Sequence, residues 1–132
     1  MYALANTCPE PEPRRERTIL VAEDEVLIRD AIAQHLRSHG FRVIEAANAA
    51  EAMDALRSGE QIDLLFTDVS MPGVMNGVML ARWVQQNHAE VTVVLASGQK
   101  YDGRALPDHP LFLKPYDPDA VEAHIRRALA ET

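Results

Sequence analysis

Acidic, hydroxyl and lysine side chains stand at the ends of four apolar runs in this sequence. The run at residues 64–67 leads directly to Asp68, and the pattern then breaks at Pro72 and Gly73. Such a run is typical of a buried strand that delivers one carboxylate to a loop. Alone, Asp68 is equally well explained as a turn or helix-capping residue. Its interest comes from the ends of the other three runs, which carry Glu23 and Asp24, Ser97, and Lys114.

Together these side chains would suit a divalent cation and a phosphoryl group. The three carboxylates and one ammonium carry a formal charge of −2. Oxygen ligands without histidine or cysteine favour a hard ion such as Mg²⁺, which needs only one or two carboxylates and a phosphate. Asp68 can then act as the nucleophile in phosphoryl transfer. Lys114 would pair with a phosphate oxygen, and Ser97 would donate a hydrogen bond.

Each of these residues also has an ordinary structural explanation. Glu23 and Asp24 could be acids favoured by the dipole of a following helix. Ser97 precedes Gly98 and, taken alone, reads as a turn residue. Lys114 is more distinctive, because only two of the 13 basic residues are lysine. Lysine is a compact phosphate-binding charge, whereas this chain otherwise uses arginine for its positive surface charge.

The elements that must position these residues alternate between strands and helices. Apolar and β-branched runs predict strands at residues 19–22, 42–46, 63–67, 91–96 and 111–113. Helical periodicity predicts helices at residues 26–39, 49–58, 78–88 and from 118 onward, with a weak fifth helix at residues 99–106. The alternation predicts an α/β fold, a doubly wound five-stranded parallel sheet with helices on both faces. Reactive groups would then gather outside the carboxyl ends of the strands.

Composition narrows the class of protein. The 132 residues suffice for one folded domain, expected at residues 18–132, after a proline-rich and apolar-poor segment at residues 1–17 that predicts a disordered or loosely attached tail. A net charge of −7 disfavours nonspecific nucleic-acid binding. The only cysteine, Cys8, rules out an internal disulfide and fits a reducing cytoplasm. No apolar run is long enough to suggest a membrane span or a secretory signal.

With these motifs in place, the sequence resembles the receiver domains of two-component response regulators from about Arg17 to Ala130. The matching motifs are VAEDE at residues 21–25, TDVSMPG at 67–73 with Gly77, ASG at 96–98 and FLKPY at 112–116. They occur in the expected order and on the expected strand ends, which makes the resemblance specific.

The resemblance implies a flavodoxin-like sheet of strand order 2-1-3-4-5 and phosphorylation of Asp68 by a histidine kinase or histidine phosphotransfer protein. It implies that Mg²⁺ is held by Glu23, Asp24, Asp68 and the backbone carbonyl of Ser70. It also implies that Ser97 and Lys114 bind the phosphoryl group and that the Lys114–Pro115 peptide bond is cis. The expected protein is a stand-alone, single-domain response regulator and no metabolic enzyme. Its output would come from phosphorylation-dependent binding of an unknown downstream protein through residues 99–130.

One departure from the family pattern keeps an alternative open. Receivers usually carry an aromatic residue three positions before the lysine, whose rotation is coupled to the hydroxyl residue, and here that position is Leu111. Leu111 favours a pseudo-receiver, a constitutive protein-binding module whose site no longer reacts, whereas the complete set of acids, hydroxyl and lysine opposes it. A small phosphatase using Asp68 is a third reading, but the loops are too short to supply a substrate-covering cap.

The five histidines show no shared metal-binding spacing along the sequence, so they are expected to be solvated. They are His35, His39, His88, His109 and His124.

Overall fold

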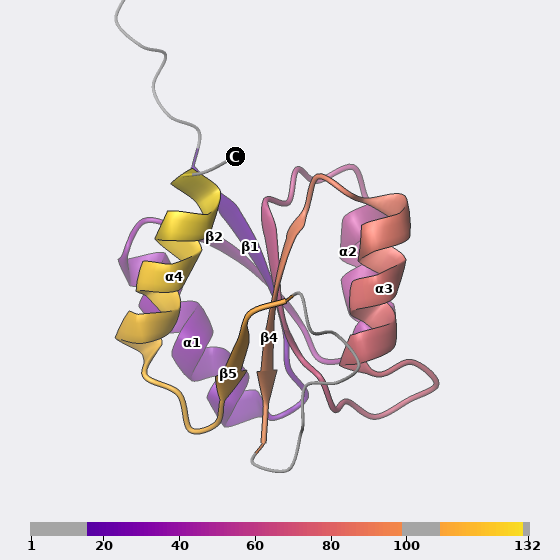
Figure 1. Ribbon diagram of the computed structural model, residues 1–132, viewed down its shortest axis with the longest axis horizontal. Coiled ribbons are helices and arrows are strands. Elements are labelled where there is room, and N and C mark those ends of the chain that lie inside the picture. Colours follow the sequence, from indigo (N-terminus) through magenta and orange to yellow (C-terminus); the bar gives the residue numbers. More distant parts are fainter. Residues whose placement is uncertain (1–15, 99–108, 131–132) are drawn as a thin grey trace, which may run out of the picture.

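The computed structural model describes residues 16–98 and 109–130, which form a parallel sheet between two layers of helices (Figure 1). The elements follow one another as β1 (Thr18–Ala22), α1 (Val26–Ser38), β2 (Arg42–Ala46), α2 (Ala49–Arg57), β3 (Leu64–Asp68), α3 (Gly77–Asn87), β4 (Thr92–Ser97), β5 (Leu111–Leu113) and α4 (Pro118–Ala130). None of the helices in this part of the chain is long and apolar enough to cross a bilayer.

All strand pairs are parallel, and their order is β2-β1-β3-β4-β5. This confirms the α/β fold with its doubly wound five-stranded sheet, and it confirms the order 2-1-3-4-5 implied by the resemblance. The chain therefore reverses direction across the sheet next to β1, between β1 and β3. The carboxyl ends of these two central strands lie side by side, which is the place where α/β proteins build their sites.

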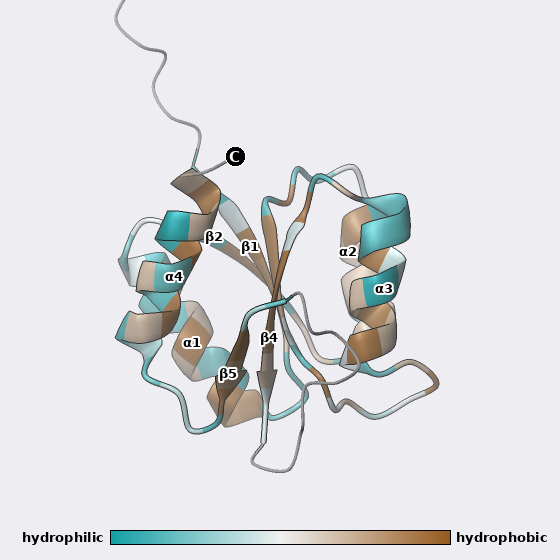
Figure 2. Ribbon diagram, viewed as in Figure 1, coloured by the Kyte–Doolittle hydropathy of each residue, from teal (hydrophilic) through white to brown (hydrophobic). Residues whose placement is uncertain are grey.

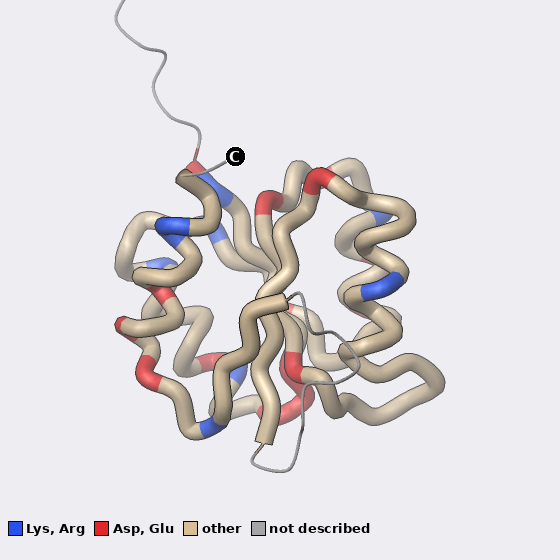
Figure 3. The backbone as a smooth tube through the Cα atoms, in the orientation of Figure 1, with Lys and Arg blue, Asp and Glu red and all other residues tan. Residues whose placement is uncertain are grey.

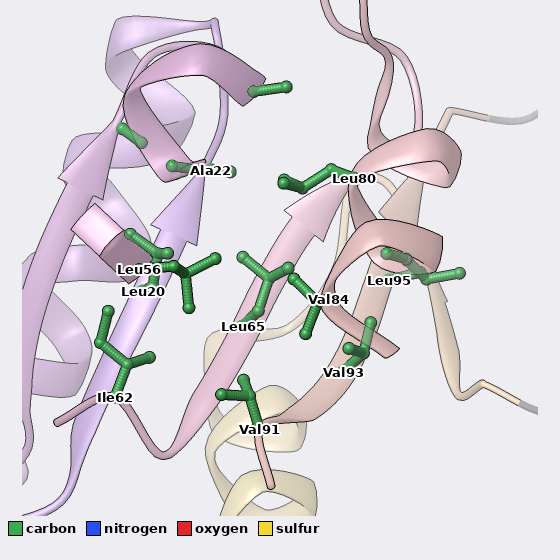
Figure 4. Close-up of a cluster of buried hydrophobic side chains, with 14 of the residues drawn as sticks. Leu20, Ala22, Leu56, Ile62, Leu65, Leu80, Val84, Val91, Val93 and Leu95 are labelled. Atoms are coloured by element: carbon green, nitrogen blue, oxygen red, sulfur yellow. The ribbon is translucent and has the colours of Figure 1, made fainter. Parts of the chain in front are cut away.

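The sheet is buried on both faces because alternate residues of its strands enter two separate hydrophobic clusters. Leu20 and Leu65 face the cluster beneath α2 and α3, where Leu56, Leu80 and Val84 cover them (Figure 4). The opposite cluster lies beneath α1 and α4, and its members include Ile19, Val21, Phe66, Ile32, Leu36, Val121 and Ile125. Burial on both faces explains why β1 and β3 read as continuous apolar runs.

Asparagine side chains cap the start of two helices. Asn48 accepts a hydrogen bond from the backbone N–H of Glu51 at 2.8 Å, and the Glu51 side chain accepts from the N–H of Ala47 at 2.8 Å, a close variant of a capping box. Asn76 caps α3 in the same way through the N–H of Met79. Apolar and polar residues alternate along each of the four helices (Figure 2), and the buried residues of each helix are apolar or glycine.

Several element boundaries differ by one residue from the prediction. Strand β3 extends through Asp68, which pairs with Ala96, and β4 extends through Ser97, which pairs with Leu113. Asp68 and Ser97 are thus the last residues of their strands. Backbone pairing continues as far as these residues although their side chains are polar. The weak helix predicted at residues 99–106 lies outside the described residues.

Arg17, near the start of the described residues, is already bonded to the start of β2 and to the residue before β3. The carbonyl of Arg17 accepts a hydrogen bond from the N–H of Arg42 at 2.9 Å, and its guanidinium lies 3.6 Å from the carboxylate of Asp63. Residues 1–15, the greater part of the predicted tail, lie outside the described residues.

Gly77 allows α3 to start against the end of β3. Its N–H donates to the carbonyl of Val69 at 2.9 Å, and a Cβ built on Gly77 would lie only 1.7 Å from the carbonyl oxygen of Asp68. Any side chain here would push the first turn of α3 away from the strand that carries Asp68. Gly77 thus fixes the distance between the third helix and the site.

We expect Gly77→Ala to lower the free energy of unfolding by about 1–3 kcal/mol or more, because the added methyl group overlaps backbone atoms that cannot move independently. Gly98→Ala is the matched control, since a Cβ there meets no atom of the described residues within 4 Å. Urea unfolding of the two variants measures the difference. Equal stability of the two would show that α3 can shift without cost.

Candidate functional site

The acidic and basic residues named from the sequence meet at the carboxyl edge of the sheet. Figure 3 shows acidic positions gathered near the ends of the central strands at this edge. Asp68 ends β3, Glu23 follows β1 directly, and Lys114 follows β5. These elements are neighbours because β1 pairs with β3, and β4 joins β3 to β5.

Lys114 lies between two buried carboxylates. Its Nζ is 2.8 Å from Oδ2 of Asp68 and 2.5 Å from Oε1 of Glu23. The side chains are 14%, 7% and 4% exposed for Lys114, Asp68 and Glu23 respectively, so water screens these interactions poorly. Glu25 is a third and more exposed anion, with Oε2 3.8 Å from Nζ.

The two buried carboxylates are also held by backbone groups. Oδ1 of Asp68 accepts a hydrogen bond from the N–H of Ser70 at 3.2 Å, and Oε2 of Glu23 accepts from the N–H of Glu25 at 3.0 Å. The guanidinium of Arg29 donates to the backbone carbonyl of Glu23 at 2.9 Å, which ties the loop after β1 to α1. Each carboxylate therefore has one oxygen toward Lys114 and the other toward the main chain.

Burial and neighbouring charges have opposing effects on the pKa values of the ionisable groups in this cluster. Burial raises the pKa of Glu23, although Lys114 and the N–H of Glu25 partly offset it and the nearby Asp68 charge adds to it. Burial would lower the pKa of Lys114, but hydrogen bonds to Asp68 and Glu23 overcome this and raise it. Lys114 is thus firmly cationic. Burial, with the negative charge of Glu23, raises the pKa of Tyr116 to about 12, so its hydroxyl stays neutral.

Three carboxylates are arranged so that they could share a cation. One oxygen from each of Glu23, Asp24 and Asp68 lies within 4.8 Å of the other two. Asp24 is exposed while the other two are buried, so an ion would be reached from solvent on the Asp24 side. The donor set is oxygen alone and suits a hard ion such as Mg²⁺. Ser70, whose carbonyl was the fourth predicted ligand, follows Asp68 by two residues and is exposed.

Ser97 is buried beside Lys114. Its backbone carbonyl accepts a hydrogen bond from the N–H of Lys114 at 2.7 Å, which ties the ends of β4 and β5 together. The Lys114–Pro115 peptide bond that follows is cis, as the resemblance implied. The structure thus brings Asp68, Glu23, Asp24, Ser97 and Lys114 to one edge, where four strands end.

Leu111 lies on the same face of the sheet as Ser97. Leu111 packs against the cluster beneath α2 and α3, and Ser97 shares this face because it is two residues from Leu95 of the same cluster. Phe112 and Tyr116 pack instead on the opposite face, where both contact Phe66 edge to face. Neither aromatic residue can therefore replace the one that is absent at position 111.

Two contributors to the site were missing from the sequence-based set. Glu25 belongs to the VAEDE motif but is not among the predicted ligands, and Arg29 is not among the predicted site residues. Arg29 lies four residues after Glu25, and its N–H donates to the Glu25 carbonyl at 2.9 Å in the first turn of α1. A basic residue one turn into the helix after the acidic loop is the signal that could have drawn attention to it.

Comparison with known proteins agrees with this geometry. The family model for the response regulator receiver domain matches residues 19–126. The aerobic respiration control protein ArcA of Escherichia coli K12 is 29% identical over 119 residues, which cover 86% of this chain and 49% of ArcA. The sensor kinase CckA of Brucella abortus is 34% identical over 89 residues, covering 67% of this chain and 9% of that protein. This chain spans about half the length of such relatives, or less.

Solved structures show the same fold. A response regulator receiver protein from Sinorhizobium medicae is 25% identical with a TM-score of 0.79, covering 87% of this chain and 95% of that one. A CheY-like receiver domain from Methanospirillum hungatei has a TM-score of 0.80 at 24% identity, covering 89% of this chain and 96% of that one. The match extends over nearly all of each neighbour.

We expect Glu23→Gln to stabilise the metal-free protein at neutral pH. Because burial raises the pKa of Glu23, the folded protein binds this proton more tightly than the unfolded chain, and wild-type stability falls as pH rises above the ordinary value of 4.5. Glutamine has no such proton, so its advantage is largest at neutral pH and fades as pH approaches 4.5. Urea unfolding in the presence of a chelator, from pH 4.5 to neutral pH, measures the difference in the free energy of unfolding between Glu23→Gln and wild type.

Glu60→Gln is the control for this experiment. Glu60 is exposed, and a hydrogen bond from Arg42 lowers the pKa of its carboxyl, so removing the charge gives no gain at neutral pH. If Glu23→Gln and wild type had the same pH dependence, Glu23 would be as solvated in the folded protein as in the unfolded chain.

Proposed function

The chain belongs to the response regulator receiver domain family, and on this premise we propose that Asp68 accepts a phosphoryl group from a phosphohistidine on a histidine kinase or histidine phosphotransfer protein. The observation that supports it most directly is the buried Asp68 carboxylate, held between the Lys114 ammonium and the Ser70 N–H and sharing a possible cation site with two other acids. Receiver domains act as phosphoacceptors and are not metabolic enzymes.

In the proposed reaction an oxygen of Asp68 attacks phosphorus as the bond from phosphorus to the histidine nitrogen breaks. The products are an acyl phosphate on Asp68 and an imidazole on the donor, which leaves as the neutral ring when its other nitrogen carries the proton. Receiver domains bind Mg²⁺ at this acidic pocket, and in this chain Glu23, Asp24, Asp68 and the carbonyl of Ser70 would hold it. An ion held there would offset the negative charge that the donor brings to the acids.

Lys114 and Ser97 are the residues that would bind the transferred group. Lys114 already lies 2.8 Å from Oδ2 of Asp68, so its ammonium can move to a phosphoryl oxygen with little displacement. The Ser97 hydroxyl, at the end of β4 on the neighbouring strand, would donate a second hydrogen bond. Charge-assisted hydrogen bonds of this kind are stronger than neutral ones.

Phosphorylation would act on partner binding by shifting the population of two arrangements of the site. A change from 1:99 to 99:1 requires about 5.5 kcal/mol of differential binding. New bonds from Lys114 and Ser97, made in one arrangement and lost in the other, would supply part of it. The proposed output is a phosphorylation-dependent interaction with a downstream protein. The stand-alone arrangement, the tail at residues 1–17 and the cytoplasmic location stay predictions.

A pseudo-receiver that binds its partner constitutively is the second candidate, and Leu111 is the observation that favours it. The leucine on the Ser97 face cannot stack or hydrogen-bond as an aromatic residue would. The two candidates differ in whether Asp68 reacts at all.

We expect Asp68→Asn to abolish phosphoryl incorporation while the protein stays folded, because the amide keeps the shape of the carboxylate but is not a nucleophile. The purified protein is incubated with a small-molecule phosphodonor, with and without Mg²⁺, and its intact mass is measured. Wild type should gain one phosphoryl group only with Mg²⁺. Asp54→Asn, which removes an exposed aspartate of α2, should behave like wild type.

An adduct that persists in Asp68→Asn would identify a different acceptor. If wild type gives no adduct, and a Mg²⁺-dependent phosphoryl analogue does not bind either, the pseudo-receiver is the better description.

A further inference from the structure

Two histidines and one glutamate form a cluster away from the carboxyl edge, between α1 and α4. His35 lies in the last turn of α1, His39 caps the end of that helix four residues later, and Glu122 lies opposite them on α4. Nε2 of His35 is 2.9 Å from Oε1 of Glu122, and Nε2 of His39 is 3.8 Å from the same oxygen. One imidazole nitrogen of each histidine and one carboxylate oxygen lie within 4.8 Å of one another.

These separations suit a tetrahedral metal ion. Ligands about 2.0–2.1 Å from a zinc ion lie about 3.3 Å apart, and the two measured distances to Oε1 fall on either side of that value. Histidines at positions i and i+4 of a helix project from one face, which is the spacing that helical zinc sites use. Small rotations of the side chains would complete the geometry.

The histidine at the exposed end of the cluster is oriented for binding through Nε2. Nδ1 of His39 lies 2.8 Å from the backbone carbonyl of His35, so Nδ1 carries the proton and donates it there. Nε2 of a neutral His39 is then the nitrogen with a free lone pair, and it is the one that faces Glu122. A hydrogen bond from the second ring nitrogen to a carbonyl is the usual support of metal-binding histidines.

Glu122 is held so that one oxygen remains for a ligand. Its Oε2 accepts a hydrogen bond from Nε of Arg126 at 2.9 Å, while Oε1 faces the histidines. Arg126 also donates to the backbone carbonyl of His39 and packs over the ring of Phe41. The hydrogen bond from Arg126 lowers the pKa of Glu122 despite partial burial, so the carboxyl is ionised.

We propose that His35, His39 and Glu122 bind a divalent transition-metal ion of the zinc class and thereby link α1 to α4. Two imidazoles and one carboxylate suit such an ion better than Mg²⁺ or Ca²⁺, which prefer oxygen alone. Water, or the exposed Asp119 whose Oδ1 is 3.4 Å from Nε2 of His35, would take the fourth position. This site shares no residue with the phosphoacceptor cluster, so it does not depend on the proposed function.

The sequence predicted solvated histidines with no shared site. His39 is exposed as predicted, whereas the His35 side chain is only 18% exposed and Nε2 of His124 is buried. The third ligand is 87 residues from His35 and becomes its neighbour only when α4 packs beside α1 (Figure 1). No local pattern could have joined them.

The test is a Zn²⁺ titration of the untagged full chain by calorimetry. It is run in a Cys8→Ser background, so that no thiolate can bind, and in excess Mg²⁺, so that the acids near Asp68 are occupied by the harder ion. We expect one equivalent of Zn²⁺ to bind, with the affinity falling at least about tenfold in His39→Ala and in Glu122→Gln. Co²⁺ in place of Zn²⁺ should give the visible absorption of a tetrahedral site.

His88→Ala is the matched control, because His88 also faces a carboxylate, Glu90 at 3.7 Å, but belongs to neither group of three potential metal ligands among the described residues. His88→Ala should bind Zn²⁺ with the same affinity as the parent protein, which carries Cys8→Ser alone. His39 is 44% exposed, so its replacement should not unfold the protein, and Zn²⁺ should raise the melting temperature of the parent but not of His39→Ala.

Unchanged affinity in His39→Ala and Glu122→Gln, or an equal loss in His88→Ala, would place the metal elsewhere and overturn the proposal. Absence of saturable binding would overturn it as well, and would leave the cluster as a hydrogen-bonded contact between His35 and Glu122.

Discussion

A single partly buried ammonium holds the carboxyl edge of this protein together. Lys114 contacts Glu23 and Asp68, two carboxylates that come from different strands and would repel each other strongly in a poorly solvated site. Burying a charge is tolerated only with a partner, and here one cation partners two anions. Any new anion on Asp68 must therefore compete with Glu23 for the same ammonium. This shared partner is the physical link between the state of Asp68 and the loop after β1.

The sheet makes this arrangement possible through its register. Ala22 pairs with Thr67, Asp68 pairs with Ala96, and Ser97 pairs with Leu113, so the residues after each of these strands emerge at one level. Gly77 then lets α3 approach the end of β3 closely enough to close the site on that side. The site is thus a consequence of four strand ends in register.

Most of the fold could be predicted because its signals are local. Strands buried on both faces read as apolar runs, and the helices carry one apolar stripe each, whereas the strand order came from the family resemblance. Boundaries were off by one at Asp68 and Ser97, since backbone pairing extends a strand past the point where its side chains turn polar. That the five predicted site residues lie at one edge of the sheet could be inferred because each ends a strand or follows one by one or two residues. Glu25 and the His35 cluster could not, because their partners Lys114 and Glu122 are brought to them only by packing between elements distant in sequence. Arg29 differs, since its contact with the Glu23 carbonyl spans six residues and its spacing from the acidic loop is a local signal.

Leu111 restricts how a change at Asp68 could reach the outer surface of the protein. Its side chain shares the Ser97 face, and the nearby aromatic residues Phe112 and Tyr116 are committed to the opposite face through Phe66. An aromatic rotation that follows the Ser97 hydroxyl is therefore not available to β5. The remaining connection in the described part of the chain is the main chain itself, where the N–H of Lys114 donates to the carbonyl of Ser97. A movement of Lys114 toward a phosphoryl oxygen would lengthen or shorten this backbone hydrogen bond. The change at Asp68 would then reach the surface as a displacement of β5 relative to β4.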